Sequence, residues 1–265
     1  MTDLADQYPV QVICEVLGVP TERHADFARW GDALTYILSL DLFNHLDQVG
    51  AAAIELFEYL EELIAERQAH PQDDLVTSLI QASDEGDRLD PMELRTMVGG
   101  LLFAGYDTTR NQLGHGLVLF AEHPEQWELL AERPELAPGA VHEVMRSSSV
   151  ADGTARLASE DVEIDGWRIP AGTIVMLFIR SANHDPSAYD DPDRFDITRE
   201  PTVGHLSFGA GPHYCLGANL ARAELEEAFV LMAQRMPGVR LDGDVEWRTD
   251  TGIKGPSKLP LAFDV

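Results

Sequence analysis

One segment of this chain, from Asp90 to Glu122, constrains the fold more than any other, because its pattern favours one long helix. Asp90 is a preferred N-cap residue, Pro91 suits the first helical position, and Glu93 completes a capping box. The helical pattern continues to Glu122, and Pro124 ends it. About 30 residues at roughly 1.5 Å each give a rod of about 45 Å. We therefore expect a helix that crosses a whole domain.

Glycines interrupt this helix at Gly99, Gly100, Gly105, Gly114 and Gly116. Each interior glycine costs roughly 0.5–1 kcal/mol relative to alanine, so glycine is tolerated where something must approach the backbone closely. For Gly114 and Gly116 we favour tight packing against another helix.

The most apolar stretch, residues 97–121, lies inside this helix but does not read as a membrane span. Several polar groups within one bilayer crossing would be costly. We interpret the stretch as a buried helix of a soluble protein. The polar residues are Asp107, Arg110, Asn111, Gln112 and His115.

The charge balance disfavours partners with negative surfaces. The chain has 19 Lys and Arg against 46 Asp and Glu, which gives a formal net charge of −27. Such a chain repels phosphate backbones and anionic lipids, so we expect no nucleic-acid partner and no membrane partner. Two cysteines, Cys14 and Cys215, cannot form a disulfide framework, and the first ten residues lack the features of a secretory signal. The expected location is therefore the reducing cytoplasm.

The rest of the chain predicts a mainly α-helical fold with a minor β part. Helical patterns occupy residues 10–17, 22–40, 44–69, 75–82 and 222–236. Apolar runs bounded by turn residues predict strands at 162–164 and 173–179, with a hairpin turn at Asp165-Gly166, and short strands near 245–247 and 261–263. Residues 183–214 predict a coil rich in proline and glycine. Because no repeat or linker divides the sequence, we expect a single domain over residues 1–265.

Cys215 stands directly before the last predicted helix, in the run from Phe208 to Gly217. A cysteine at a helix N-terminus meets free backbone N–H groups and the positive end of the helix dipole, and both favour the thiolate. Glycines at 209, 211 and 217 remove side chains around the sulfur, so a large flat group could approach the backbone. The alternative is a small buried hydrophobic residue, the usual role of a free cysteine. Composition alone leaves both interpretations open.

An acid and an alcohol, Asp107 and Thr108, stand side by side in the long helix. On its own the pair means little, because a helical threonine can bond back to a carbonyl and a mid-helix aspartate is usually solvated. Inside the most apolar helix of the chain, however, such a pair is costly unless it has partners.

A second charged pair, Glu143 and Arg146, has the i, i+3 spacing that places both side chains on one helix face. One interpretation is a surface ion pair that contributes less than about 1 kcal/mol. The other is a buried pair with a structural role.

The segment around Cys215 resembles the haem-binding loop of the cytochrome P-450 superfamily. That pattern is Phe, two variable residues, Gly, one variable, Arg or His, one variable, Cys, one variable, Gly. Phe208, Gly211, His213, Cys215 and Gly217 fill every fixed place. The other motifs stand in the family's order, with the Asp107 segment first, then Glu143, then Arg194, then Cys215.

The resemblance implies haem b (iron protoporphyrin IX) with Cys215 as its axial iron ligand. It also implies that Phe208, Gly209, Gly217, Ala104 and Gly105 surround the haem, and that Gly105 leaves room for oxygen. Further roles follow by position. Asp107 and Thr108 would relay protons, His213 and Arg156 would bind haem propionates, and Glu143, Arg146 and Arg194 would form a buried network behind the cysteine loop.

The activity implied by the resemblance is that of a haem-thiolate monooxygenase. It would insert one oxygen atom from O2 into a hydrophobic small molecule, with electrons from a ferredoxin and ferredoxin reductase or a similar donor. An acid–alcohol pair favours the dioxygen route over a peroxide-driven one. Arg222 is a candidate contact for an acidic ferredoxin, with a solvated helix charge as the alternative.

Residue 1 matches a point well inside the usual family chain. The resemblance therefore implies that roughly the first third of the family's fold is missing, including part of the sheet, a propionate-binding helix and a lid over the substrate. A second hypothesis follows, in which the chain is a truncated, non-catalytic remnant or a haem-binding module without turnover.

Overall fold

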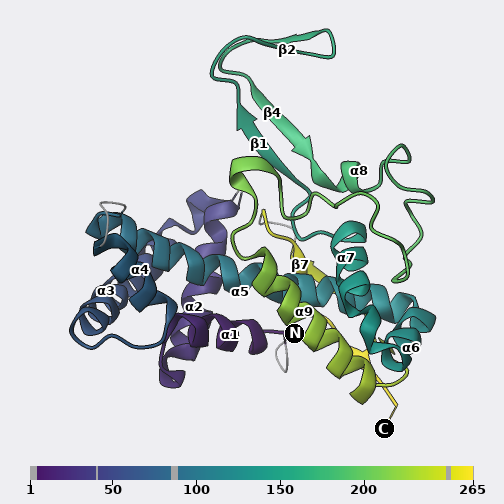
Figure 1. Cartoon of the computed structure of the whole chain (residues 1–265), viewed down its shortest axis with the longest axis horizontal. Helices are drawn as coiled ribbons and strands as arrows, with labels where there is room; N and C mark the ends of the chain where they lie inside the picture. The colour runs from purple at the N-terminus through teal and green to yellow at the C-terminus, as the bar shows by residue number, and fades with distance from the viewer. Residues whose placement is uncertain (1–4, 40, 85–88, 249–251, 265) are drawn as a thin grey trace. The chain divides into compact units, whose positions relative to one another are not determined.

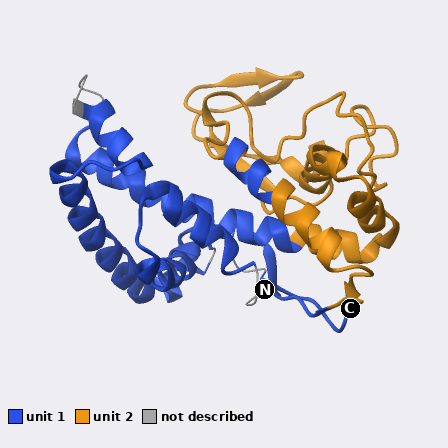
Figure 2. Cartoon of the chain, turned by 60° about the horizontal axis from the view of Figure 1, so that its bottom comes forward, with its two compact units in different colours: residues 1–114, 219–225, 241–261 blue, residues 115–218, 226–240, 262–265 orange. Residues whose placement is uncertain are grey.

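The computed structural model describes residues 5–39, 41–84, 89–248 and 252–264. They form two compact units, which Figure 2 colours separately. The first unit comprises residues 1–114, 219–225 and 241–261, and the second comprises 115–218, 226–240 and 262–265. Helices α5 (Pro91–Glu122) and α9 (Ala218–Arg235) contribute residues to both units. So do the short paired strands β5 (Arg240–Leu241) and β8 (Leu261–Ala262).

The first unit is helical and carries one β-hairpin (Figure 1). Its helices are α1 (Tyr8–Leu17), α2 (His24–Leu34), α3 (Leu46–Ala69), α4 (Leu75–Asp84) and the first part of α5. Strands β6 (Glu246–Arg248) and β7 (Gly255–Lys258) form the antiparallel hairpin. Leu17, Leu60, Val76 and Val98, one from each of four helices, are fully buried in its core.

The long helix begins as the sequence predicts. Oδ1 of Asp90 accepts hydrogen bonds from the backbone N–H groups of Met92 and Glu93, both at 2.8 Å. The Glu93 carboxylate accepts the Asp90 N–H at 2.8 Å, which completes the capping box. The helix then runs unbroken for 32 residues. Within the described part of the chain, no helix is long and apolar enough to cross a membrane.

The segment predicted as one helix over 22–40 is divided. It contains the 3-10 turn η1 (Thr21–Arg23), α2, and the 3-10 turn η2 (Thr35–Leu38), while residue 40 lies outside the described residues. At the start of η2, the buried Thr35 hydroxyl donates to the Gly31 carbonyl at 3.0 Å, which favours the change from α to 3-10 geometry at that point. Such a back-bond competes with the helical ladder and tightens the turn. A further 3-10 turn, η3 (Leu42–Asn44), precedes α3.

The second unit joins short helices to two antiparallel strand pairs, β1–β4 and β2–β3, and a long coil. Its helical elements are α6 (Pro124–Glu132), η4 (Pro134–Leu136), α7 (Ala137–Ser147), α8 (Ile179–Asn183), η5 (Gly211–His213) and the greater part of α9. Strands β2 (Val162–Ile164) and β3 (Trp167–Ile169) form the predicted hairpin. Asp165 and Gly166 have φ values of 51° and 79°, as a tight hairpin turn requires.

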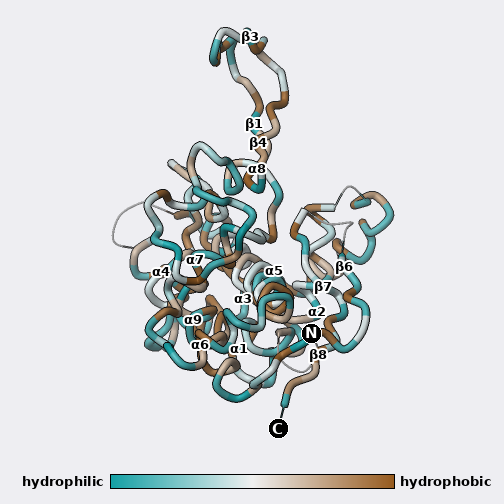
Figure 3. Tube along the Cα trace, turned by 90° about the vertical axis from the view of Figure 1, so that its right-hand side faces the viewer, coloured by the Kyte–Doolittle hydropathy of each residue, from teal (hydrophilic) through white to brown (hydrophobic). Residues whose placement is uncertain are grey.

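Strand β1 (Gly153–Leu157) was not predicted, because its alternation is short and only Leu157 is a large apolar residue. It pairs antiparallel with β4 (Ile174–Phe178), with Gly153 opposite Phe178 and Leu157 opposite Ile174. This ribbon carries β3 at its tip in Figure 3. The register places Ala155, Leu157, Ile174, Met176 and Phe178 on one face, where all five side chains are exposed.

The core of the second unit is aromatic. Phe120 of α5 packs against Trp127, Phe195 and Phe229, with ring centroids 4.9–5.5 Å apart. A Cβ on Gly116 would lie 2.2 Å from Phe229, so close helix packing explains this glycine as predicted. Helix α9 begins at Ala218 rather than at Arg222, since Gly217 already occupies the N-cap position.

Candidate functional site

Apart from Arg156 on β1, the candidate residues form three groups: a cysteine loop and a buried charge network in the second unit, and the Asp107 segment in the first.

The cysteine loop is a closed turn before α9. The Cys215 N–H donates to the Phe208 carbonyl at 2.9 Å, and the Tyr214 N–H donates to the Gly211 carbonyl at 3.0 Å. Gly209 and Gly211 have φ values of 71° and 68°, a left-handed conformation that favours glycine. These bonds and turns hold the residue at 215 at the start of the helix.

The two cysteines have opposite surroundings. Cys14 is fully buried in α1, and burial raises the pKa of its thiol to about 12, so it remains a neutral core residue. Cys215 is exposed, which rules out the interpretation of a buried hydrophobic residue.

The surroundings of Cys215 fit a flat haem group. Residues 211–217 are all exposed, and a Cβ on Gly211 or Gly217 would meet nothing within 4 Å among the described atoms. Leu216, beside the cysteine, is a large exposed apolar side chain. An accessible sulfur with open backbone and apolar surface beside it offers what a thiolate-ligated macrocycle requires.

The network behind the loop is centred on α7. Arg146 is fully buried and binds the Glu143 carboxylate with two hydrogen bonds, Nε to Oε2 at 2.8 Å and Nη2 to Oε1 at 2.9 Å. The interpretation as a surface ion pair is therefore wrong for Glu143 and Arg146. A buried bidentate pair of this kind fixes orientation as well as contributing energy.

The third member of the network is Arg199, and the prediction of Arg194 is wrong. Arg199 donates from Nε to Glu143 Oε1 at 3.2 Å, and its side chain is 14% exposed. The Arg194 side chain is 63% exposed and pairs with Asp196 at 3.1 Å. Arg194 contributes only its carbonyl oxygen, which accepts from Arg146 Nη2 at 3.3 Å and from Arg199 Nη2 at 2.8 Å. The chain turns at Asp191, where φ is 47°, and Arg199 returns to the carboxylate.

The network reaches the cysteine loop through Asn183 and Ser207, which the sequence analysis missed. Arg146 Nη1 donates to the Asn183 carbonyl at 2.9 Å. The Asn183 amide accepts the Leu206 N–H at 2.8 Å and donates to the Ser207 hydroxyl at 2.9 Å. Ser207 in turn donates to the Met145 carbonyl at 2.6 Å. The residues just before Phe208 are thereby tied to α7 and α8.

Arg156 and His213, the predicted propionate contacts, are both exposed. Arg156 lies on β1 and donates to the Thr154 hydroxyl at 3.1 Å and the Ala155 carbonyl at 2.8 Å. His213 ends η5, two residues before Cys215. Their roles toward a propionate stay predictions.

In the first unit, Asp107 is buried in a cluster of charges. Its Oδ1 lies 3.2 Å from Arg110 Nη2, 3.3 Å from Arg248 Nη1 and 3.1 Å from Asn111 Nδ2. Burial raises the pKa of Asp107, and the Arg110 guanidinium opposes that rise. Arg110, at i+3, was within reach of sequence reasoning, but Arg248 was not.

Thr108 points to a different side of α5. Its hydroxyl donates to the Ala104 carbonyl at 2.6 Å, which is the back-bond that the sequence analysis weighed as an alternative. Ala104 is exposed and Thr108 is half-buried on the same helix face. Gly105 faces α1 instead, because a Cβ there would lie 2.7 Å from Ile13. Helix packing thus explains this glycine, and its role as room for oxygen stays a prediction.

Comparison with known proteins places the chain in a family. The family model for cytochrome P-450 matches residues 18–237. The luteothin monooxygenase of Streptomyces thioluteus is 42% identical over 259 residues, which cover 96% of this chain and 63% of that protein. The vitamin D(3) 25-hydroxylase of Pseudonocardia autotrophica is 41% identical over 269 residues, which cover 99% of this chain and 65% of that protein.

Solved structures agree. The crystal structure of P450BioI in complex with an acyl carrier protein ligated to hexadec-9Z-enoic acid matches with a TM-score of 0.93 and 36% identity, over 99% of this chain and 68% of that chain. The chain belongs to the cytochrome P-450 family, and its predicted mainly α fold with a minor β part is confirmed. Membership implies a haem-thiolate iron cofactor. The chain spans 63–65% of the length of the two curated relatives named above.

Proposed function

We propose that this chain provides the thiolate side of a monooxygenase site, in which the Cys215 sulfur would bind the iron of haem b. The observation that supports this most directly is an exposed cysteine at the start of α9, in a glycine loop closed by its own N–H. Haem ligated by a thiolate activates dioxygen, because the thiolate supplies electron density that favours O–O cleavage. Phe208, Gly209 and Gly217 would line the group, and Arg156 and His213 would bind its propionates.

The chain's own residues have three tasks in this proposal. The Glu143–Arg146–Arg199 network and Asn183 hold the cysteine loop in place. Asp107 holds or releases a proton at its carboxylate, and Thr108 moves a proton at its hydroxyl after leaving the Ala104 carbonyl. Ala104 leaves its face of α5 free of a bulky side chain, while room for oxygen at Gly105 stays a prediction, because that glycine packs against Ile13. Correct mutual positioning of the reacting groups lowers a barrier substantially, so these supporting contacts matter for the proposed function.

The partners proposed follow from the family. Electrons would come from a ferredoxin and ferredoxin reductase or a similar donor, with Arg222 as a candidate contact. The substrate class is a hydrophobic small molecule, in keeping with relatives named for luteothin and vitamin D(3). Cytoplasmic location and a single domain over 1–265 stay predictions.

The test is the spectrum of the reduced, carbon-monoxide-treated protein. We expect the red-shifted Soret band of a thiolate-ligated haem, its loss in Cys215→Ser, and its retention in Cys14→Ala, which changes the buried cysteine instead. Turnover is then assayed as substrate-dependent NADPH consumption with surrogate ferredoxin partners. Identical spectra for the wild type and Cys215→Ser would refute the ligand. Haem binding without coupled product would favour a haem-binding module over an oxygenase.

A further inference from the structure

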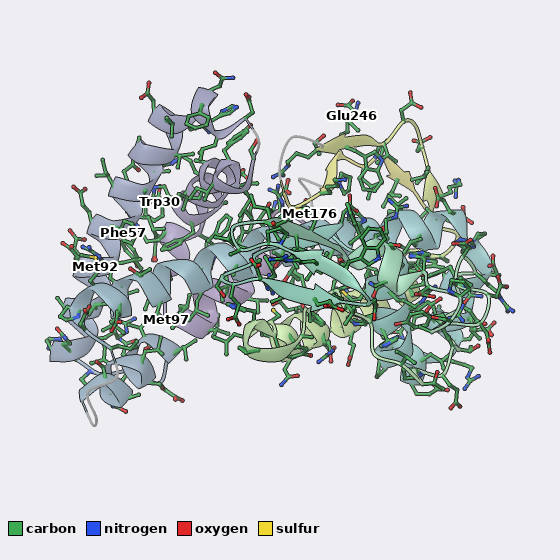
Figure 4. All side chains as sticks on the ribbon, turned by 90° about the horizontal axis from the view of Figure 1, so that it is seen from above. Trp30, Phe57, Met92, Met97, Met176 and Glu246 are labelled. Carbon is green, nitrogen blue, oxygen red and sulfur yellow. The ribbon has the colours of Figure 1, made fainter. Side chains whose placement is uncertain are left out.

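The β6–β7 hairpin is fixed to the turn of α5 that carries Asp107, within the first unit. Arg248, the last residue of β6, reaches Asp107 Oδ1 at 3.3 Å. Gly255, the first residue of β7, lies so close to Asn111 that a Cβ on the glycine would be 2.2 Å from the amide oxygen. Figure 4 labels Glu246 at the other end of β6. The hairpin thus contacts Asp107 through the Arg248 side chain, and it contacts Asn111, one helical turn further along α5, through the Gly255 backbone.

Arg110, one of the two cations beside Asp107, also contacts other carboxylates. Arg110 Nη1 lies 2.8 Å from Asp32 of α2 and 3.4 Å from Asp6, and it donates to the Tyr106 hydroxyl at 2.9 Å. One guanidinium therefore serves three carboxylates, of which Asp107 is the most buried. Three negative charges around one positive charge leave Asp107 short of compensation.

Arg248 supplies the second cation, and Asp107 is the carboxylate that it contacts among the described residues. The Arg248 side chain is 20% exposed, against 1% for Asp107, so the arginine lies between the buried acid and solvent. Removing one partner of a buried ion pair leaves the other uncompensated, and a carboxyl in that position takes up a proton.

We propose that Arg248 is a positioning residue for Asp107, which favours the ionised form of the acid and holds it turned toward the β6–β7 hairpin. The inference rests on the proposed function, in which Asp107 handles protons for oxygen activation. An ionised acid can accept a proton and pass it on, whereas a permanently protonated one cannot. The hairpin, through a single side chain, sets the proton-handling state of α5.

The experiment measures the protonation of Asp107 in the folded chain. The infrared band of the protonated carboxyl is followed against pH and assigned by its absence in Asp107→Asn. In Arg248→Gln we expect the titration midpoint to rise by at least about one pH unit, because an opposite charge at this distance shifts an acid by about 1–3 units. Arg248→Lys, which keeps the charge, is expected to restore most of the shift.

Glu246→Gln is the matched control on the same strand, since Glu246 pairs with Lys258 at 3.0 Å and not with Asp107. An unchanged midpoint in Arg248→Gln, or an equal rise in Glu246→Gln, would overturn the proposal. Should Arg248→Gln not fold, Arg248→Met is used, since it keeps the length of the side chain and removes the charge.

The second readout is the pH profile of product coupling in the haem-loaded protein, which we expect to move in parallel with the midpoint. A shifted midpoint with an unmoved profile would overturn the positioning role. The infrared titration needs neither haem nor turnover. A missing red-shifted Soret band would therefore refute the proposed function. The infrared titration would still test the Arg248 contact independently.

Discussion

At the scale of single residues, two glycines of α5 occupy opposite surroundings. Gly116 faces the ring of Phe229, and a Cβ there would lie 2.2 Å from the ring carbon Cζ. Gly100, on the same helix, has nothing within 4 Å of a Cβ among the described atoms. The same substitution therefore has opposite expected effects at the two positions.

We expect Gly116→Ala to destabilise the protein by about 1–3 kcal/mol, because Phe229 must leave its rotamer or the helices must separate. Gly100→Ala is expected to stabilise it by roughly 0.5–1 kcal/mol through helix propensity. Urea unfolding midpoints of both variants give the comparison. A loss of stability at both positions would contradict the packing account.

Residue-level prediction succeeded where the signal was local. The capping box of Asp90 and Glu93 needs only residues three apart, and it forms as predicted. The close approach at Gly105 depends on Ile13, which lies in another helix, so the sequence could not show which neighbour required the glycine. Arg248 is 141 residues from Asp107 along the chain and was beyond reach for the same reason.

At the scale of elements, the coil between α8 and α9 is organised by α7. Glu143 accepts from Arg146, Arg199 and the Asp196 N–H at 3.1 Å. Arg194 and Arg199 both precede the cysteine loop, and the sequence offered no local difference that selects one of them. The choice depends on the direction of the backbone after Asp191, which only the folded chain defines.

The two arginines make a matched pair for mutation. Arg199→Ala leaves Glu143 with one cation fewer in a buried site, so we expect a loss of about 2–4 kcal/mol. Arg194→Ala removes an exposed ion pair and is expected to cost less than about 1 kcal/mol. The measurement is the free energy of unfolding in urea. Equal losses of unfolding free energy in the two variants would show that the Arg194 side chain also belongs to the network.

Strands show the same division between local and distant signals. The β2–β3 hairpin was predicted from Asp165-Gly166, a turn that its own residues specify. Strand β1 was missed because its place depends on its pairing with β4, seventeen or more residues further along the chain.

At the scale of the whole molecule, a buried acid in α9 links stability to pH. Glu224 is 4% exposed, and its Oε2 has no hydrogen-bond partner among the described residues. Burial raises the pKa of Glu224 from 4.5 to about 8. Between these two values the folded chain keeps a proton that the unfolded chain releases, so stability falls as pH rises across that window.

We expect this group to contribute a slope of about 1.4 kcal/mol per pH unit, which Glu224→Gln removes. Asp107 has a pKa raised by burial and acts in the same direction, so the difference between variant and wild type isolates Glu224. Glu227→Gln, an exposed position on the same helix, is the control. Unfolding in urea at a series of pH values measures the slope. A slope in Glu224→Gln equal to that of the wild type would refute the assignment.

The exposed apolar face of the β1–β4 ribbon makes the negative charge of the chain relevant to its self-association. Its face of Leu157, Ile174, Met176 and Phe178 is open to water, and two such faces on neighbouring molecules would attract each other. A net charge of −27 opposes that attraction, so we expect the molecules to stay apart in dilute buffer. Salt shortens the reach of that repulsion to about 10 Å at 0.1 M, so we expect self-association to increase with ionic strength.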